Sequence, residues 1–502
     1  MKKNFILITT LILMISCCID ANKDIDNEDN NTETFAQTIT NTLGKTLYLV
    51  KMNPTVKNVS AEKSGYVNLE SNVFIDSNEN YTLQNSTEFI RRDNPLALTF
   101  YPKNASASAR VRAFNSVEYD IGDEKPFWII TNDASYISDI VWGEIYATLR
   151  AKGDFCYIWV PDKYWENGNN SVSEIRVKEL AKKFNSIYPR VTNVFGYPYS
   201  SESPIHILIL DINPNRTSSK TETVTLGYFM PKDYSEYDET YRSNECCMFY
   251  LDAALTEEKP EAAYSTLAHE FQHMINYYNK IFCTSANNEE SYTWFTEMLS
   301  MLCEDMMQTF LGISDNESPI ARLQEFNSKY FNQGITEWQG NTLSYACVYA
   351  FGAYLVRNFG GVKLLSAIGK NKLINRESIT AALKELGYDE TFNSVFLKFS
   401  EALIYEDSNK LTFNKSITEE LNGYEYTFKA FNIWETRNYS YYYDPYYYYG
   451  PYYFSPAKSL SVRPYGFTIH TQESWKNIRT DTLTVKITKP KNSNIEYRFI
   501  LK

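Results

Sequence analysis

The sequence predicts an α+β protein in which strands come first and helices follow. Short apolar runs typical of buried strands occur at 127–130, 156–160 and 205–210, with a helix expected near 137–151 between the first two. From Pro260 to about residue 405 the apolar spacing becomes helical almost continuously. Strand-rich and helix-rich stretches that are segregated along a chain are typical of this fold class.

The length and composition indicate a globular, acidic protein of several domains. A chain of 502 residues is too long for one ordinary hydrophobic core. Its content of 43% hydrophobic and 16% aromatic residues is well above that of disordered chains. The formal net charge is −12, and we find no basic stripe. Because an acidic chain of this kind repels phosphate backbones, the composition argues against nucleic acid as a partner.

The N-terminus has the pattern of an export signal. Two lysines precede an apolar run at 5–15 that is too short for a comfortable membrane span. Ser16 followed by Cys17 resembles the processing site of bacterial lipoproteins, which implies cleavage after Ser16 and acylation of Cys17. We therefore expect lipid anchoring to the bacterial cell envelope, on its periplasmic or its outer side. The alternative is ordinary signal cleavage nearby, which would also export the protein.

Changes in composition along the chain predict its division into segments. Polar residues with little to bury follow the signal, short alternating strands come next, and β character returns after the helical region. Proline and glycine in a tyrosine-rich insert exclude a regular helix or central strand there. The predicted segments are a signal peptide at 1–16, a disordered tether at 17–35, an N-terminal β domain at 36–115, the α+β domain at 116–414, and a C-terminal β domain at 415–502 that contains the insert at 439–454.

The strongest functional signal lies at residues 266–276. The chain has only four histidines, and two of them, His269 and His273, are four residues apart around Glu270. On an α-helix this spacing places both imidazoles on one face, where they can share one metal ion. Glu270 lies beside them and can reach a water on that metal. A helix is predicted because Pro260 suits a first turn and an apolar stripe follows it. The alternative is a helix with two solvent-facing histidines.

A catalytic zinc site needs three protein ligands and one open position. A histidine six residues after His273 would indicate a metzincin, but an asparagine stands there. The third ligand is therefore expected to be a carboxylate. Glu297 is the first candidate, because its apolar neighbours make a carboxylate costly to bury unless it meets a cation. Glu304 is the alternative ligand, or a partner of a ligand histidine. His206 lies in an apolar strand and is expected to be a core residue.

The stretch AlaHisGluPheGlnHis at 268–273, followed by TrpPheThrGluMet at 294–298, resembles the gluzincin group of zinc peptidases. It is more closely similar to the hyicolysin-type family of secreted bacterial metallopeptidases, over about residues 116–405. The resemblance implies a zinc endopeptidase domain at 116–414, with small β domains on either side of it. It also implies a strand-rich N-terminal lobe and a helical C-terminal lobe, with a single zinc ion between them.

The resemblance further implies a tyrosine over the transition-state oxygen. The related aminopeptidases carry such a tyrosine on a helix similar to 344–360, and this comparison favours Tyr345, with Tyr349 one turn later as the alternative. A tyrosine that only packs in an interior helix would look the same in sequence. The chain lacks a GlyAlaMetGluAsn-like aminopeptidase motif, which favours cleavage within chains over trimming of an N-terminus.

Two functions are compatible with these features. The first is a zinc-dependent endopeptidase of protein or peptide substrates, in which Glu270 is the general base for a metal-activated water. A strand at 205–210 or 226–230 would then pair with an extended substrate. The second is a surface lipoprotein that binds host or neighbouring-cell material and keeps a structural or vestigial metal site. A binding protein has no need for Glu270, which favours the first function.

Overall fold

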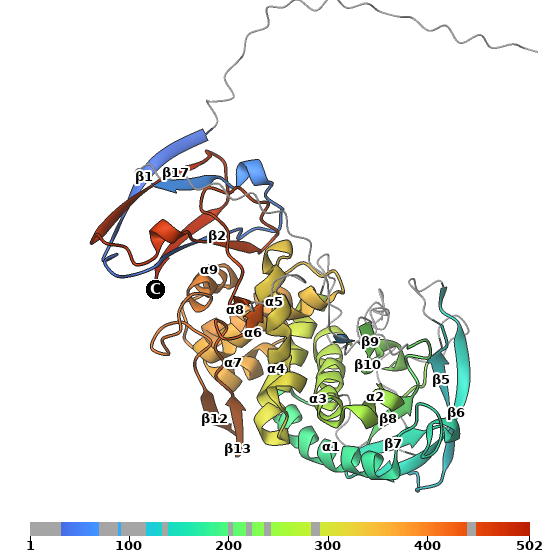
Figure 1. Cartoon of the computed structure of the whole chain (residues 1–502). Coiled ribbons are helices and arrows are strands. Elements are labelled where there is room, and N and C mark those ends of the chain that lie inside the picture. Colours follow the sequence, from blue (N-terminus) through green and yellow to red (C-terminus); the bar gives the residue numbers. More distant parts are fainter. Residues whose placement is uncertain are drawn as a thin grey trace, which may run out of the picture.

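The computed structural model describes residues 32–69, 89–91, 117–132, 139–198, 204–216, 223–234, 242–282, 292–438 and 448–502. The predicted signal peptide, Cys17 and most of the predicted tether lie outside these residues. The described part contains a β-sandwich, a helical region and a curled sheet, arranged in that order across the molecule (Figure 1). The mixture of helices and strands confirms the predicted α+β class.

The largest sheet has six strands in the order β10-β11-β8-β7-β6-β5. Strands β7, β8 and β11 run parallel to one another, whereas β10, β6 and β5 pair in antiparallel fashion with their neighbours. The central strands are buried on both faces, which explains their unbroken apolar sequences. The bounds are β5 Glu124–Ile130, β6 Trp142–Lys152, β7 Cys156–Val160, β8 Ile205–Leu210, β10 Gly227–Phe229 and β11 Met248–Asp252.

The helix expected near 137–151 is wrong, because this stretch forms the long strand β6. Its backbone pairs with β5 along one edge and with β7 along the other. The aromatic and β-branched residues in it, such as Trp142 and Ile145, fit a pleated strand better than a helix. The short apolar pattern alone did not distinguish the two structures.

One face of this sheet curls around its own apolar core, which includes Phe127 and Trp159. Asn244, which precedes β11, holds the curl closed. Its side chain accepts a hydrogen bond from the Trp128 nitrogen at 2.7 Å and donates one to the Trp128 carbonyl at 3.0 Å. His206 lies beside this core, where its Nδ1 accepts from the Trp159 indole at 3.0 Å and burial lowers its pKa to about 3. His206 is therefore neutral, but its side chain is half-buried, so it lies at the margin of this core and not inside it.

Helices cover the opposite face of the sheet and form the rest of the apolar core (Figure 1). Helix α1 begins after Ser173, whose hydroxyl accepts from the Arg176 nitrogen, and α4 ends at Gly312 in the left-handed conformation. Helix α3 starts with Pro260 in its first turn, as predicted. The helices are α1 Glu174–Phe195, α2 Ala253–Glu258, α3 Pro260–Tyr277, α4 Thr293–Leu311, α5 Leu323–Lys329, α6 Thr342–Asn358, α7 Gly361–Lys370, α8 Asn375–Glu385 and α9 Phe392–Ala402.

The two ends of the chain build one β-sandwich together rather than separate β domains. One sheet has the order β1-β17-β3 and the other β16-β2-β18, so each combines strands from both ends. Strand β1 starts at Thr32, inside the predicted tether, whereas the hairpin β12–β13 packs with α4 in the helical region. The bounds are β1 Thr32–Thr40, β2 Leu47–Met52, β3 Tyr66–Leu69, β12 Ile417–Leu421, β13 Tyr424–Phe428, β16 Phe467–His470, β17 Thr482–Pro490 and β18 Glu496–Leu501.

Strand β2 is buried on both faces and joins the sandwich to the helical region. Leu47 and Leu49 pack inside the sandwich with Ile487. Val50 and Met52 belong to the large core that the helices share. Because alternate residues of a strand point to opposite faces, one short strand serves both cores.

Part of the tyrosine-rich insert falls on the described residues. Of the tyrosine-rich insert, the pair Tyr448–Tyr449 forms β15, which pairs with β14 at Arg437–Asn438, and residues 439–447 lie outside the described part. The described cysteines are buried free thiols; they are Cys156, Cys246, Cys247, Cys303 and Cys347. Across the described ranges, no helix has both the length and the apolar character needed to cross a bilayer.

Candidate metal centre

The predicted metal-binding histidines lie on α3, deep in the protein. Helix α3 packs between α1 and α4 (Figure 1), so nearly all of its side chains are covered. His269 and Glu270 are 0% exposed and His273 is 1% exposed. Three polar, ionisable groups that are buried so completely need a partner to offset the cost of desolvation.

Helix α4 brings Glu297 to these histidines. The two Nε2 atoms of His269 and His273 lie 3.0 Å apart, and the Oε2 atom of Glu297 lies 3.4 Å from the first and 3.6 Å from the second. A tetrahedral zinc ion with bonds of about 2.0–2.1 Å separates its ligand atoms by about 3.4 Å. The three donor atoms therefore match one zinc ion in spacing and in chemistry. Within the described residues, these are the side chains that group as a metal site.

Glu304 lies on the far side of the His269 ring. Its Oε1 is 2.7 Å from His269 Nδ1, and its Oε2 accepts from the Ser265 hydroxyl at 2.6 Å. A carboxylate at Nδ1 holds the proton there and leaves Nε2 as the electron-pair donor. Of the two alternatives for Glu304, this position fits a partner of His269, and Glu304 is not among the three side chains that group as a candidate metal site.

Thr296 makes the corresponding contact to the second histidine, and the sequence analysis missed it. Its Oγ1 lies 3.0 Å from His273 Nδ1. One turn later, the Ser300 hydroxyl donates to Gln272 Oε1 of α3 at 2.6 Å. Thr296, Ser300 and Glu304 are spaced four residues apart, so they form one polar stripe along α4. That stripe was the sequence signal for the face of α4 that meets α3.

The candidate tyrosines lie on α6, which packs against α4. The Tyr345 ring packs edge-on against Trp338, with ring centroids 4.9 Å apart, and lies 5.0 Å from the Arg322 guanidinium carbon. Tyr349 is fully buried, and its hydroxyl donates to Asp305 at 3.2 Å. Because that hydroxyl is already used in a buried ion-pair network, Tyr349 is poorly suited to bind a reacting oxygen.

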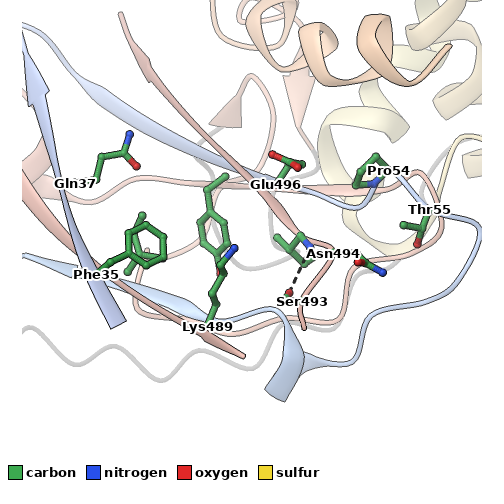
Figure 2. A pocket seen from close by; sticks show the side chains of 11 residues that line it. Phe35, Gln37, Pro54, Thr55, Lys489, Ser493, Asn494 and Glu496 are labelled. Atoms are coloured by element: carbon green, nitrogen blue, oxygen red, sulfur yellow. Dashed lines mark hydrogen bonds between the residues drawn. The ribbon is translucent and has the colours of Figure 1, made fainter. Parts of the chain in front are cut away.

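A surface groove of about 490 Å³ lies in the β-sandwich and contains none of these residues (Figure 2). It runs between β1, β17 and β18. Phe35 lines one side with a ring that is 42% exposed. The Lys489 ammonium lies 5.9 Å from the Phe35 ring and 5.9 Å from the Tyr497 ring. The groove is therefore separate from the candidate metal site.

One family model matches the part of the chain that contains the candidate metal site. Residues 147–416 match the model of the peptidase M30 family. The chain belongs to the peptidase M30 family. The matched region begins within β6, ends before the β12–β13 hairpin, and includes α3, α4 and α6. This finding confirms the predicted family.

Similar proteins include one curated relative and two solved structures. The chain is 29% identical over 257 residues to "Neutral metalloprotease ShpI" of Staphylococcus hyicus, which covers 47% of this chain and 53% of that protein. It therefore spans about half the length of this curated relative. Two solved structures of an M1 zinc metallopeptidase from Deinococcus radiodurans align with 10% identity over 55% of this chain, covering 61% and 60% of the other chains, with TM-scores of 0.30 and 0.29. A similarity that low supports no conclusion about the fold.

Proposed function

We propose that this M30 family protein is a zinc-dependent endopeptidase. His269, His273 and Glu297 are the proposed metal ligands, and Glu270 is the proposed general base. The observation that carries the proposal is the spacing of three buried donor atoms, 3.0 to 3.6 Å from one another, which suits one tetrahedral ion. Membership of a peptidase family and similarity to a neutral metalloprotease support peptide bonds as the substrate.

The chemistry divides between the ion and the protein. A bound zinc ion lowers the pKa of its water to about 7 and acts as a Lewis acid. Glu270 accepts the proton of the attacking water at a carboxylate oxygen and then delivers it to the departing amide nitrogen. Tyr345 is the proposed hydrogen-bond donor to the carbonyl oxygen of the substrate as negative charge develops there.

The sheet suggests where an extended substrate binds. The strand at 205–210, one of the two candidates, lies between β7 and β11 and has no open edge. Strand β10, the other candidate, is the last strand of the described sheet and lies against α3. A Cβ atom at Gly227 would meet the Thr266 methyl group at 2.8 Å, so the glycine permits this close approach. We propose that substrate pairs with β10. It would then bind between the sheet and the helical region, which are the strand-rich and helical lobes of the proposed peptidase domain.

The test combines metal analysis with a peptide-library digest read by mass spectrometry. We expect one zinc per chain, and cleavage at internal bonds that stops when a chelator removes the metal. Cleavage confined to the N-terminal residue of each peptide would contradict an endopeptidase. Zinc without cleavage of any peptide would contradict the enzymatic function.

We also propose that the protein is exported and that lipid is attached at Cys17. The predicted signal at 1–16 supports this proposal, and β1 begins at Thr32, which leaves a polar linker between lipid and fold. The Cys17→Ser variant should move from the membrane fraction to the soluble fraction and should not incorporate a labelled fatty acid. Equal labelling of this variant and the wild type would exclude Cys17 as the site.

Binding of host or neighbouring-cell material is a second candidate function, favoured by the groove in the sandwich (Figure 2). An exposed aromatic ring beside polar and charged groups is typical of binding sites. Contact between the ring and water is unfavourable, and a bound partner would remove it. The Phe35→Ala variant should then bind less to intact cells while its rate of peptide cleavage stays unchanged. If cell binding also stays unchanged, the groove has no such role.

A further inference from the structure

A buried hydrogen-bond network extends from His273 away from the metal centre. Thr296 Oγ1 lies 3.0 Å from His273 Nδ1, and the Asn276 amide donates to the same oxygen at 3.0 Å. The Asn276 amide also donates to the Tyr292 hydroxyl. His273, Thr296 and Asn276 are each at most 2% exposed, and Tyr292 is 6% exposed. Two of these residues come from α3, one from α4, and Tyr292 directly precedes α4.

We propose that Asn276 and Tyr292 are positioning residues that hold the Thr296 hydroxyl as an acceptor for His273, and so keep the electron pair of His273 on Nε2, where it can bind metal. This role deepens the proposed zinc site and rests on His273 being a ligand there. The sequence analysis did not assign any of the three residues.

The argument depends on which atom carries each proton. A histidine that binds metal through Nε2 must carry its proton on Nδ1, which then donates a hydrogen bond. A threonine hydroxyl can either accept from Nδ1 or donate to it, so Thr296 alone does not decide between the two tautomers of His273. A second group must therefore restrict how the Thr296 hydroxyl is used.

Asn276 and Tyr292 supply that restriction. The Asn276 amide nitrogen can only donate, and it donates to the oxygens of both Thr296 and Tyr292. The contact with Tyr292 thus holds the amide in place against the Thr296 oxygen. The Thr296 oxygen has two lone pairs, one of which accepts from Asn276. The other accepts from His273 Nδ1–H, which places the electron-pair donor of His273 at Nε2.

A neighbouring contact separates this role from ordinary helix packing. Ser300 and Gln272 form a buried hydrogen bond between the same two helices, one turn further along α4. This hydrogen bond does not include a proposed metal ligand. Ser300→Ala therefore removes a comparable interhelical bond and serves as the matched control.

The experiment measures zinc affinity of the full chain by competition with a fluorescent chelator. Thr296→Val should weaken zinc binding by about 10- to 100-fold, the usual effect of losing a partner of a ligand histidine. Thr296→Ser, which restores the hydroxyl, and Ser300→Ala should both bind zinc nearly as tightly as the wild type. Equal losses in Thr296→Val and Ser300→Ala would overturn the proposal, because packing alone would then explain them.

The dependence on Asn276 is tested by a double-mutant cycle. Asn276→Ala alone should weaken zinc binding, but in a Thr296→Val background it should add less than about twofold, since it acts through the same hydroxyl. Independent, additive losses would overturn the proposal. If Thr296→Val does not fold, Tyr292→Phe is the alternative variant, because it removes a single oxygen atom. It should also weaken zinc binding. Wild-type zinc affinity in Tyr292→Phe would contradict the role of Tyr292.

A spectroscopic readout tests the tautomer directly. With only four histidines, the chain can be labelled with ¹⁵N-histidine and its ring nitrogens resolved by NMR in the zinc-free state. His273 should carry its proton on Nδ1 in the wild type. In Thr296→Val, His273 should become a mixture of its two tautomers. His206 is the internal reference, because its Nδ1 accepts from Trp159 and its proton is therefore on Nε2. An unchanged His273 tautomer in Thr296→Val would overturn the proposal.

The outcomes for this network and for the proposed function are distinguishable. If the wild type binds zinc but cleaves no peptide, the enzymatic function fails while the loss in Thr296→Val still supports the network. If the wild type cleaves peptides and Thr296→Val binds zinc equally well, the network alone is refuted. A wild type that binds no zinc refutes both.

Discussion

Replacing Glu304 measures how strongly one buried hydrogen bond supports the metal centre. Glu304 accepts from His269 Nδ1 at 2.7 Å and from Ser265 at 2.6 Å, and both His269 and Glu304 are 0% exposed. Solvent therefore does not screen the interaction. Loss of such a partner weakens metal binding by about 10- to 100-fold, which corresponds to about 1.4–2.8 kcal/mol at about 1.4 kcal/mol for each factor of ten.

Two substitutions bracket this magnitude. Glu304→Gln keeps an oxygen that can accept from His269, so we expect a loss near the lower end of the range. Glu304→Ala leaves both His269 Nδ1–H and the Ser265 hydroxyl without that acceptor, so we expect a loss near the upper end. The assay is competition for zinc with a chelator of known affinity, with the more exposed Glu258→Gln as the control.

Two results would refute the reasoning. Wild-type zinc affinity in Glu304→Ala would mean that the hydrogen bond does not orient His269. A complete loss of zinc binding, equal to that of His269→Ala, would instead indicate that Glu304 is a ligand itself. Either outcome is read from the same titration.

Three further predictions concern catalysis and stability. Glu270→Gln should retain one zinc ion but lose about 10²- to 10⁴-fold in kcat, the usual contribution of a general base; a peptide assay with wild-type turnover would contradict the proposed role. Asp305→Ala should lower the free energy of unfolding by about 3–5 kcal/mol in urea denaturation, because the buried Arg357 then loses the carboxylate that it binds at 2.8 and 3.0 Å. A change below about 1 kcal/mol, roughly the value of a surface ion pair, would refute this. Burial lowers the pKa of Lys280 in the folded protein to about 7. Above that pH the unfolded chain binds more protons than the folded protein. The free energy of unfolding should therefore rise as the pH increases from about 7 toward the ordinary pKa of lysine. The rise should be smaller in Lys280→Met, and equal pH dependence in both proteins would exclude Lys280 as its source.

The sequence predicted the parts of the site that depend on local spacing. His269 and His273 are one helical turn apart, and α-helical geometry alone places them together. Glu297 followed from its apolar neighbours, because an isolated carboxylate in a buried helix needs a cation. Thr296 and Asn276 were missed because their significance depends on how α3 and α4 face each other. Only the packed structure fixes which side chains meet across two helices.

The fold was predictable where one periodicity dominated. The runs at 156–160 and 205–210 form β7 and β8, and the change to helical spacing after Pro260 is α3. The stretch that forms β6 has a weaker pattern, and its structure is decided by pairing with β5 and β7. The pairing of β1 with β17 joins residues from opposite ends of the chain, which no local pattern encodes.

The shared sandwich has a consequence for biogenesis. Strand β2 emerges from the ribosome well before its two neighbours, β16 and β18, which follow it far along the chain. Until they arrive, an apolar strand that is buried on both sides in the native protein has no partner, and such a strand is prone to aggregation. Maturation of this region must therefore wait until β16 and β18 have been made. A chain that stops before β16 should be degraded rather than accumulate as a shorter, stable product.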